Sequence, residues 1–264
     1  MSDDRRLSIL EHIRELRIRL TRSVIAVAIT TIISFIFAGQ IFELLTYKSP
    51  FSRAASDIMV NKFHLLPVPD VNLVYIDMTE MLGIYMKVCL VAGIILAIPY
   101  LLYQVLMFVS PGLTSKEKKY VYLVLPWVSL MFLVGVAFGY FILIPPATKF
   151  LLTFGSDIAT PQIRVGNYIS LVTRMLLAIG LVFELPVFIT LLARLGVVTH
   201  KWLAGKRRWA IVVAFVLGAA ITPTLDPVNQ CLVAVPLILL YEVSIWLARF
   251  VQRKRVKAAA TSTE

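Results

Sequence analysis

Two carboxylates stand where most of their charged neighbours are cationic. Glu15 lies among arginines, and Glu117 is the only acid in a loop rich in lysine. Two nearby carboxylates can bind two guanidinium groups through bidentate, charge-assisted hydrogen bonds. Each acid also has a structural alternative, because Glu15 can pair with Arg19 one helical turn later, and Glu117 can form a capping box with Thr114. The spacing alone does not choose between these interpretations.

A third carboxylate, Glu184, falls in the middle of an apolar run. Placing an acid at the centre of a bilayer costs about 2.5–3.5 kcal/mol, so such a residue normally faces protein or water and marks a functional site. Pro186 removes the hydrogen bond to the carbonyl of Val182 and predicts a bend in the helix. The structural alternative is a hydrogen bond between helices.

A polar turn lies between the last two apolar segments. Asp226 precedes Pro227, a pattern typical of a helix cap, and Gln230 follows one turn later. The same polar groups could receive a polar side chain of a partner protein.

The remaining charges within apolar segments have structural interpretations. Lys87 and Arg174 lie in the outer parts of two predicted spans, and Glu80 shares a helix face with Lys87, so we expect a structural ion pair. Glu242 is expected to meet Arg249 or the membrane interface.

The sequence contains no catalytic signature. It has no GxxxxGK[ST], HExxH or GxSxG pattern, its three histidines are far apart, and its two cysteines form no CxxC. We therefore expect neither an enzyme nor a bound cofactor or metal. Any work must draw on binding or on the membrane potential, which supplies about 2.3 kcal/mol per charge per 100 mV.

The composition indicates a polytopic membrane protein. The 264 residues are 59% hydrophobic with a mean hydropathy of +0.85. The net charge of +11 does not indicate nucleic-acid binding, because the basic residues lie at the ends of apolar segments. We expect one membrane domain over residues 1–250 and a basic, disordered tail over 251–264.

Six apolar segments predict an all-α integral membrane protein with six transmembrane helices. They cover about residues 23–45, 78–109, 120–144, 168–195, 209–221 and 228–250. The third is expected to stop at Pro145-Pro146. The fifth reaches only about 20 Å against a hydrocarbon core of about 30 Å. Either the last pair spans a thinned bilayer, which we favour, or it forms a re-entrant hairpin.

Lysine and arginine predict the orientation. They are concentrated on the segments that lie inside if the N-terminus is inside, so both termini are expected to be cytoplasmic. Residues Ser8–Leu20 form a basic amphipathic pattern, opened by Ser8 and Glu11 as a capping box, and we expect this helix to lie along the cytoplasmic surface.

Four motifs together resemble the TatC family. They are HIRELRIRL at 12–20, FVSPGL with the following glutamate at 108–117, FELP at 183–186, and ITP…DP…Q at 221–230. The resemblance implies a membrane receptor for twin-arginine signal peptides, the core subunit of a translocase that exports folded proteins by the proton-motive force. It assigns signal-peptide binding to Glu15, Arg17, Phe108 and Glu117, and a concave intramembrane groove with partner contacts to Glu184, Asp226 and Gln230.

Two departures bear on these assignments. The outer turn reads TPTLDP where many members have TPPD, which affects the alignment of Asp226. Lys118-Lys119 stands where an arginine often follows the loop glutamate, which alters the charge of the loop but leaves the role of the carboxylate.

The resemblance also implies partners and location. We expect TatA/TatB-type single-span proteins, signal peptides of folded cargo, self-association in a receptor complex, and the bacterial inner membrane. Two other functions stay open from the residues alone. One is a proton-coupled small-solute transporter with Glu184 as proton carrier, against which the lack of an internal repeat counts. The other is a structural scaffold for membrane proteins.

Overall fold

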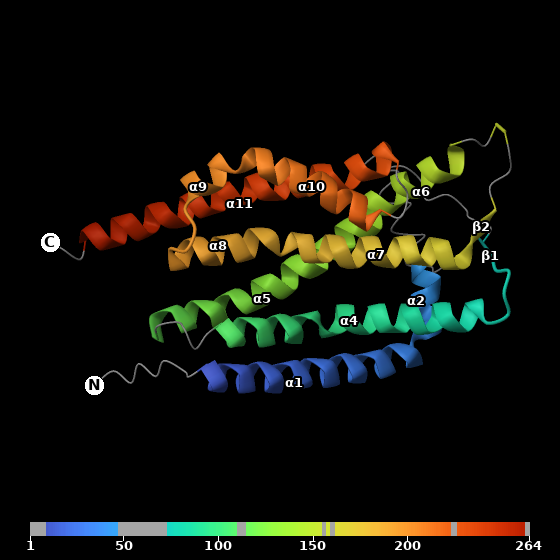
Figure 1. Cartoon of the computed structure of the whole chain (residues 1–264), viewed down its shortest axis with the longest axis horizontal. Helices are drawn as coiled ribbons and strands as arrows, with labels where there is room; N and C mark the ends of the chain where they lie inside the picture. The colour runs from blue at the N-terminus through green and yellow to red at the C-terminus, as the bar shows by residue number, and fades with distance from the viewer. Residues whose placement is uncertain are drawn as a thin grey trace.

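The protein, shown as a computed structural model, is a bundle of long helices (Figure 1). The structure describes residues 9–46, 73–109, 115–154, 157–158, 162–222 and 226–261. The helices of these ranges are α1 (Ile9–Ile36), α2 (Ala38–Leu45), α4 (Glu80–Val109), α5 (Ser115–Phe138), the π-helical turn η2 (Gly139–Leu143), α6 (Ile144–Thr153), α7 (Val165–Phe183), α8 (Leu185–Leu195), α9 (His200–Gly205), α10 (Arg207–Ile221) and α11 (Pro227–Thr261). Two-residue strands β1 (Leu73–Val74) and β2 (Ile163–Arg164) pair in parallel.

Among the described residues, five helical stretches are long and apolar enough to cross a membrane. They are Ile13–Ile36, Glu80–Phe108, Leu125–Thr153, Val165–Arg194 and Pro227–Gln252. Helix α10 has 15 residues and a length of about 22 Å, so it is shorter than a bilayer core. The all-α membrane class is confirmed, whereas a sixth crossing by α10 stays a prediction.

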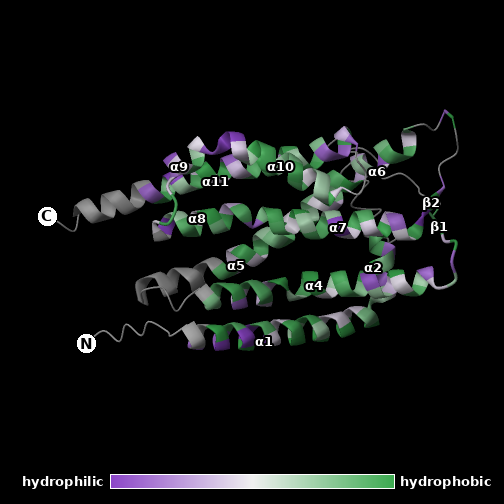
Figure 2. Ribbon diagram, in the orientation of Figure 1, coloured by the Kyte–Doolittle hydropathy of each residue, from purple (hydrophilic) through white to green (hydrophobic). Residues whose placement is uncertain are grey.

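Apolar residues make up most of the length of the helices (Figure 2), and many of their side chains are exposed. Ile32 on α1, Leu96 on α4 and Val216 on α10 are all more than half exposed. Helices that are apolar on every side suit a lipid environment, because lipid does not penalise exposed hydrocarbon.

The chain starts and ends at the same end of the bundle, which we call the terminal end (Figure 1). Helices α4 and α8 also finish there, and α5 and α10 begin there. At the opposite end lie α2 and the β1–β2 pair, with the start of α7 beside them. The end of α10 and the start of α11 stop short of that opposite end, in keeping with the short α10.

The amphipathic segment does not lie flat on the membrane. It forms the first part of the single helix α1, which continues to Ile36 without a break and is about 42 Å long. No glycine or proline separates the basic part from the apolar part, so the helix has no reason to turn between them. The expected surface orientation is therefore wrong. The first span also ends at Ile36 rather than Leu45, because a turn at Phe37 starts α2 in a new direction. Ser8 of the expected capping box lies outside the described residues.

The expected stop at Pro145-Pro146 is also wrong. The chain stays helical from α5 through η2 into α6, where the two prolines occupy the first turn. Ile144 N–H donates to Gly139 O, the i→i−5 bond of a π-turn. The π-turn thus ends one run of α-helical hydrogen bonds, and α6 starts a new one. The two prolines lie in the first turn of α6, where an N–H group has no partner within the helix in any case.

The fourth span breaks as expected. Helix α7 ends at Phe183, Glu184 forms the junction, and Pro186 lies in the first turn of α8. The N–H groups of Val187 and Phe188 both donate to Glu184 O. At its other end α8 finishes at Gly196, whose φ of 85° is the left-handed cap conformation that glycine adopts without strain.

The last helix is longer than expected. Helix α11 continues to Thr261 and so includes most of the tail that we expected to be disordered from residue 251. Ala258–Ala260 are strong helix formers, which favours this extension.

The expected pairing of Glu80 with Lys87 is wrong. Glu80 binds Arg164 at 3.1 Å rather than Lys87, and it also accepts the N–H of Ile76. Its carboxylate raises the pKa of Arg164 above the ordinary value, chiefly through this hydrogen bond. Lys87 instead donates to Ser170 Oγ at 2.7 Å.

Near the terminal end, Glu242 binds Arg207 rather than Arg249, and its alternative place at the membrane interface stays a prediction. Its two oxygens lie 2.8 and 2.9 Å from Arg207 nitrogens, which joins α11 to the start of α10.

Candidate functional site

Three helix ends that carry expected site residues, those of α1, α4 and α5, lie at the terminal end. Glu15 lies near the start of α1, Phe108 is the next-to-last residue of α4, and Glu117 is in the first turn of α5 (Figure 1). Residues 110–114 and the side chain of Glu117 lie outside the described parts of the chain. The approach of the two carboxylates therefore stays a prediction.

The Glu15 carboxylate is ion-paired within its own helix. Its Oε1 accepts Arg19 Nε at 3.0 Å and also Arg19 Nη2. The Glu15 side chain remains 23% exposed and that of Arg19 16% exposed. The expected pairing of Glu15 with Arg19 is thus confirmed, and it leaves the second carboxylate oxygen without a hydrogen bond to any described residue. Binding of a signal peptide by Glu15 stays a prediction.

A contact that the sequence analysis missed joins this pair to α4. Arg19 Nη1 donates to Gln104 Oε1 at 3.3 Å, and Gln104 is only 4% exposed. A lone amide within the apolar run 101–109 was the available signal, because a buried polar group needs a partner. The link fixes α1 against α4 beside Glu15.

Arg17 and Phe108 have different surroundings. Arg17 is exposed, and two residues along a helix place it about 200° around α1 from Glu15. Phe108 is half-buried. Arg17 therefore presents its charge to a different side of α1 from the Glu15–Arg19 pair.

Glu184 is buried in the middle of the bundle. It is 2% exposed, and neither carboxyl oxygen has a hydrogen-bond partner among the described residues. The structural alternative, a hydrogen bond from Glu184 to another helix, is not found among the described residues, although the backbone of Phe132 on α5 lies close to its carboxyl group. A buried carboxyl group is costly, so an acid at this position is more typical of a functional site than of a structural one.

Close packing of α5 against α7 surrounds Glu184. A Cβ at Gly180 would come within 2.6 Å of the Phe132 ring, and one at Gly135 within 2.7 Å of Phe183. The ring of Phe183 also packs against Phe138 at a centroid distance of 5.2 Å. These two glycines let the helix backbones approach where α7 breaks.

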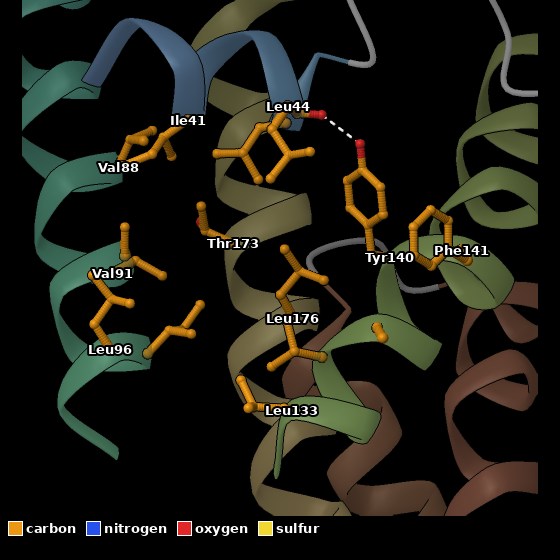
Figure 3. A pocket seen from close by; sticks show the side chains of 15 residues that line it. Ile41, Leu44, Val88, Val91, Leu96, Leu133, Tyr140, Phe141, Thr173 and Leu176 are labelled. Carbon is orange, nitrogen blue, oxygen red and sulfur yellow. Dashed lines mark hydrogen bonds between the residues drawn. The ribbon is translucent and has the colours of Figure 1, made fainter. Parts of the chain in front are cut away.

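A cavity of about 340 Å³ opens between α2, α4, α5 and α7 (Figure 3). Side chains such as Val91, Leu133 and Leu176 line it, and Glu184 is not among the lining residues. The hydroxyl of Tyr140 is engaged with Leu44 O at 2.6 Å. The cavity therefore offers an apolar hollow to a ligand, apart from the intramembrane carboxyl group.

Asp226 begins α11 as the expected cap. Its Oδ1 accepts Asn229 N–H at 2.7 Å and its Oδ2 accepts the Asn229 side-chain amide at 3.1 Å. Gln230 donates to Phe215 O at 3.0 Å across to α10, where Gly218 allows close approach. Both residues thus organise the α10–α11 turn, on elements separate from the Glu184 junction.

The comparisons with known proteins agree with this architecture. Residues 11–236 match the family model described as Sec-independent protein translocase protein (TatC). The chain is 37% identical to the TatC protein of Carboxydothermus hydrogenoformans, over 96% of this chain and 97% of that protein, and 41% identical to that of Aquifex aeolicus, over 93% and 96%. A crystal structure of a twin-arginine translocase receptor, TatC, superposes with a TM-score of 0.75 at 40% identity, covering 92% of this chain and 100% of that one. The chain therefore belongs to the TatC family of Sec-independent protein translocase proteins.

Proposed function

We propose that this chain is the signal-peptide receptor and core subunit of a Sec-independent translocase that exports folded proteins. The observation that carries this proposal is the match to the TatC family along nearly the whole chain, including a solved receptor that it covers completely. The relatives are named as translocase proteins, which favours this function over a proton-coupled solute transporter. The chain itself supplies binding surfaces, and the proton-motive force supplies the energy.

Signal-peptide recognition takes place at the terminal end. Glu15 and Glu117 bind the paired arginines, Phe108 contacts the peptide beside them, and Arg17 contributes from another side of α1. The gathering of α1, α4 and α5 at this end supports the assignment. A guanidinium requires an acceptor such as a carboxylate, and acids on a cationic surface offer a selective one.

The protein is a multi-pass protein of the bacterial inner membrane, with one membrane domain over residues 1–250. Both termini face the cytoplasm, where the signal peptide first arrives. The excess of lysine and arginine on the segments at the terminal end supports this orientation.

Partner proteins of the TatA/TatB type contact the intramembrane groove. Glu184 is the polar group that a partner helix meets within the membrane, and Asp226 with Gln230 forms a second contact at the outer turn. The burial of Glu184 without a described donor supports this role, because a partner's polar side chain would satisfy it.

Binding of a signal peptide tests the receptor function. The purified full chain, reconstituted in vesicles, is titrated with a fluorescent twin-arginine signal peptide and with the same peptide carrying paired lysines. We expect the arginine peptide to bind more tightly, and Glu15→Gln with Glu117→Gln to abolish that preference. Glu242→Gln, at the same end of the protein, serves as the matched control and should leave it intact. Equal binding of both peptides to the unmodified chain would contradict the proposal.

A further inference from the structure

Three nitrogens of the Arg19 guanidinium are held between two helices. Nε and Nη2 donate to Glu15 Oε1 on α1, and Nη1 donates to Gln104 Oε1 on α4. A guanidinium is planar with five donors in a fixed fork, so two acceptors that engage three of its nitrogens are arranged for that group. The chain's own arginine thus occupies a guanidinium-shaped acceptor site.

Gln104, the second acceptor of this site, is an unusual residue for its position. It is buried between the apolar neighbours Leu102 and Leu106 of α4, and its carbonyl oxygen points at Arg19. Burying an amide in an apolar helix is costly unless its oxygen is bonded. A leucine would fill the same space without that cost, so the amide oxygen is retained for the guanidinium it accepts.

We propose that Glu15 and Gln104 form a guanidinium subsite which Arg19 fills in the resting protein, and which one arginine of the signal peptide takes by displacing Arg19. The inference rests on the proposed function and deepens it, because it adds Gln104 as a specificity-determining residue and Arg19 as an internal competitor. Displacement is feasible, since ion pairs at this spacing on a helix are individually weak.

The two acceptors explain a preference for arginine over lysine. They lie on different helices, and a guanidinium fork reaches both at once. A lysine ammonium is a compact point charge that engages them less well. Removing the amide oxygen should therefore affect an arginine ligand and leave a lysine ligand nearly unchanged.

The first test removes the Arg19 side chain from the subsite. Arg19→Leu is compared with Arg22→Leu, which removes the same charge from an exposed position on the same helix. Peptides with paired arginines and paired lysines are titrated onto each full-length variant in vesicles. We expect Arg19→Leu to tighten arginine-peptide binding about three- to fivefold, from loss of the competitor, and Arg22→Leu to change it less than about twofold. Arg19→Lys keeps the charge without the fork and should give a smaller gain of the same sign.

The second test removes the other acceptor. Gln104→Leu in the Arg19→Leu background should weaken arginine-peptide binding about tenfold, the typical worth of a charged hydrogen bond, and leave lysine-peptide binding within about twofold. An equal effect of Arg19→Leu and Arg22→Leu, or an equal effect of Gln104→Leu on both peptides, would overturn the inference while leaving the receptor function standing. A lack of arginine preference in the unmodified chain would instead overturn the proposed function and this inference with it.

Discussion

The ring of Phe132 on α5 lies directly against the backbone of Gly180 on α7. A Cβ at Gly180 would come within 2.6 Å of Phe132 Cε2, and the ring cannot move away because Phe132 is fully buried. This contact lies one helical turn from Glu184. The crossing of α5 and α7 therefore depends on the lack of a side chain at one position.

Gly180→Ala should destabilise the protein by about 1–3 kcal/mol, because overpacking forces the helices apart. The measurement is thermal unfolding of the purified chain in detergent. Gly83→Ala is the matched control, since a Cβ there has nothing within 4 Å and alanine is the better helix former. Equal melting temperatures for the two variants would show that α5 and α7 do not need the close approach.

Two tyrosines attach α2 to the bundle. Tyr140 donates to Leu44 O at 2.6 Å and Tyr168 to Leu45 O at 3.2 Å, and both carbonyls lie in the last turn of α2, where the regular helical hydrogen bonds end. Replacing either tyrosine by phenylalanine should cost about 1 kcal/mol in unfolding free energy. Tyr100→Phe, at an exposed position, should change it far less. No difference among the three variants in denaturant unfolding would rule out this attachment.

The Arg207–Glu242 pair should contribute little to stability despite its good geometry. Both side chains are about half exposed, so a double-mutant cycle with Arg207→Gln and Glu242→Gln should give a coupling of at most about 1 kcal/mol. Added salt should reduce the coupling further. Arg208→Gln provides the control for loss of one neighbouring charge. A coupling of several kcal/mol would mean that the pair is shielded from water in the membrane.

Glu184→Gln should leave folding intact and lower export. The amide has nearly the shape of the carboxyl group, and no described donor is lost by the change. Thermal unfolding measures the first effect, and export of a twin-arginine reporter in cells lacking their own TatC measures the second. Glu184→Asp keeps the acid and should retain part of the export. Export at the normal rate in the Glu184→Gln variant would remove this residue from the proposed mechanism.

The sequence alone determined the membrane class, most of the helices and the candidate site residues. Apolar runs and their basic flanks are local properties, so they predicted the helices of the bundle without reference to packing. Pro186 likewise predicted the break at Glu184, because a missing N–H acts on its own helix. The motifs around Glu15 and Glu184 are also local stretches of sequence, so they indicated the family without reference to the tertiary structure.

Tertiary structure decided which groups meet. Glu80 could pair with Lys87 within its own helix, yet it binds Arg164, which the β1–β2 pairing brings beside it. Gln104 accepts a hydrogen bond from Arg19 only because α4 packs against α1. The π-turn η2, which carries the helix past two prolines, packs against α7, a contact that the local sequence did not predict. Helical periodicity fixes the face on which a residue lies, but contacts between helices follow from how those faces are packed together.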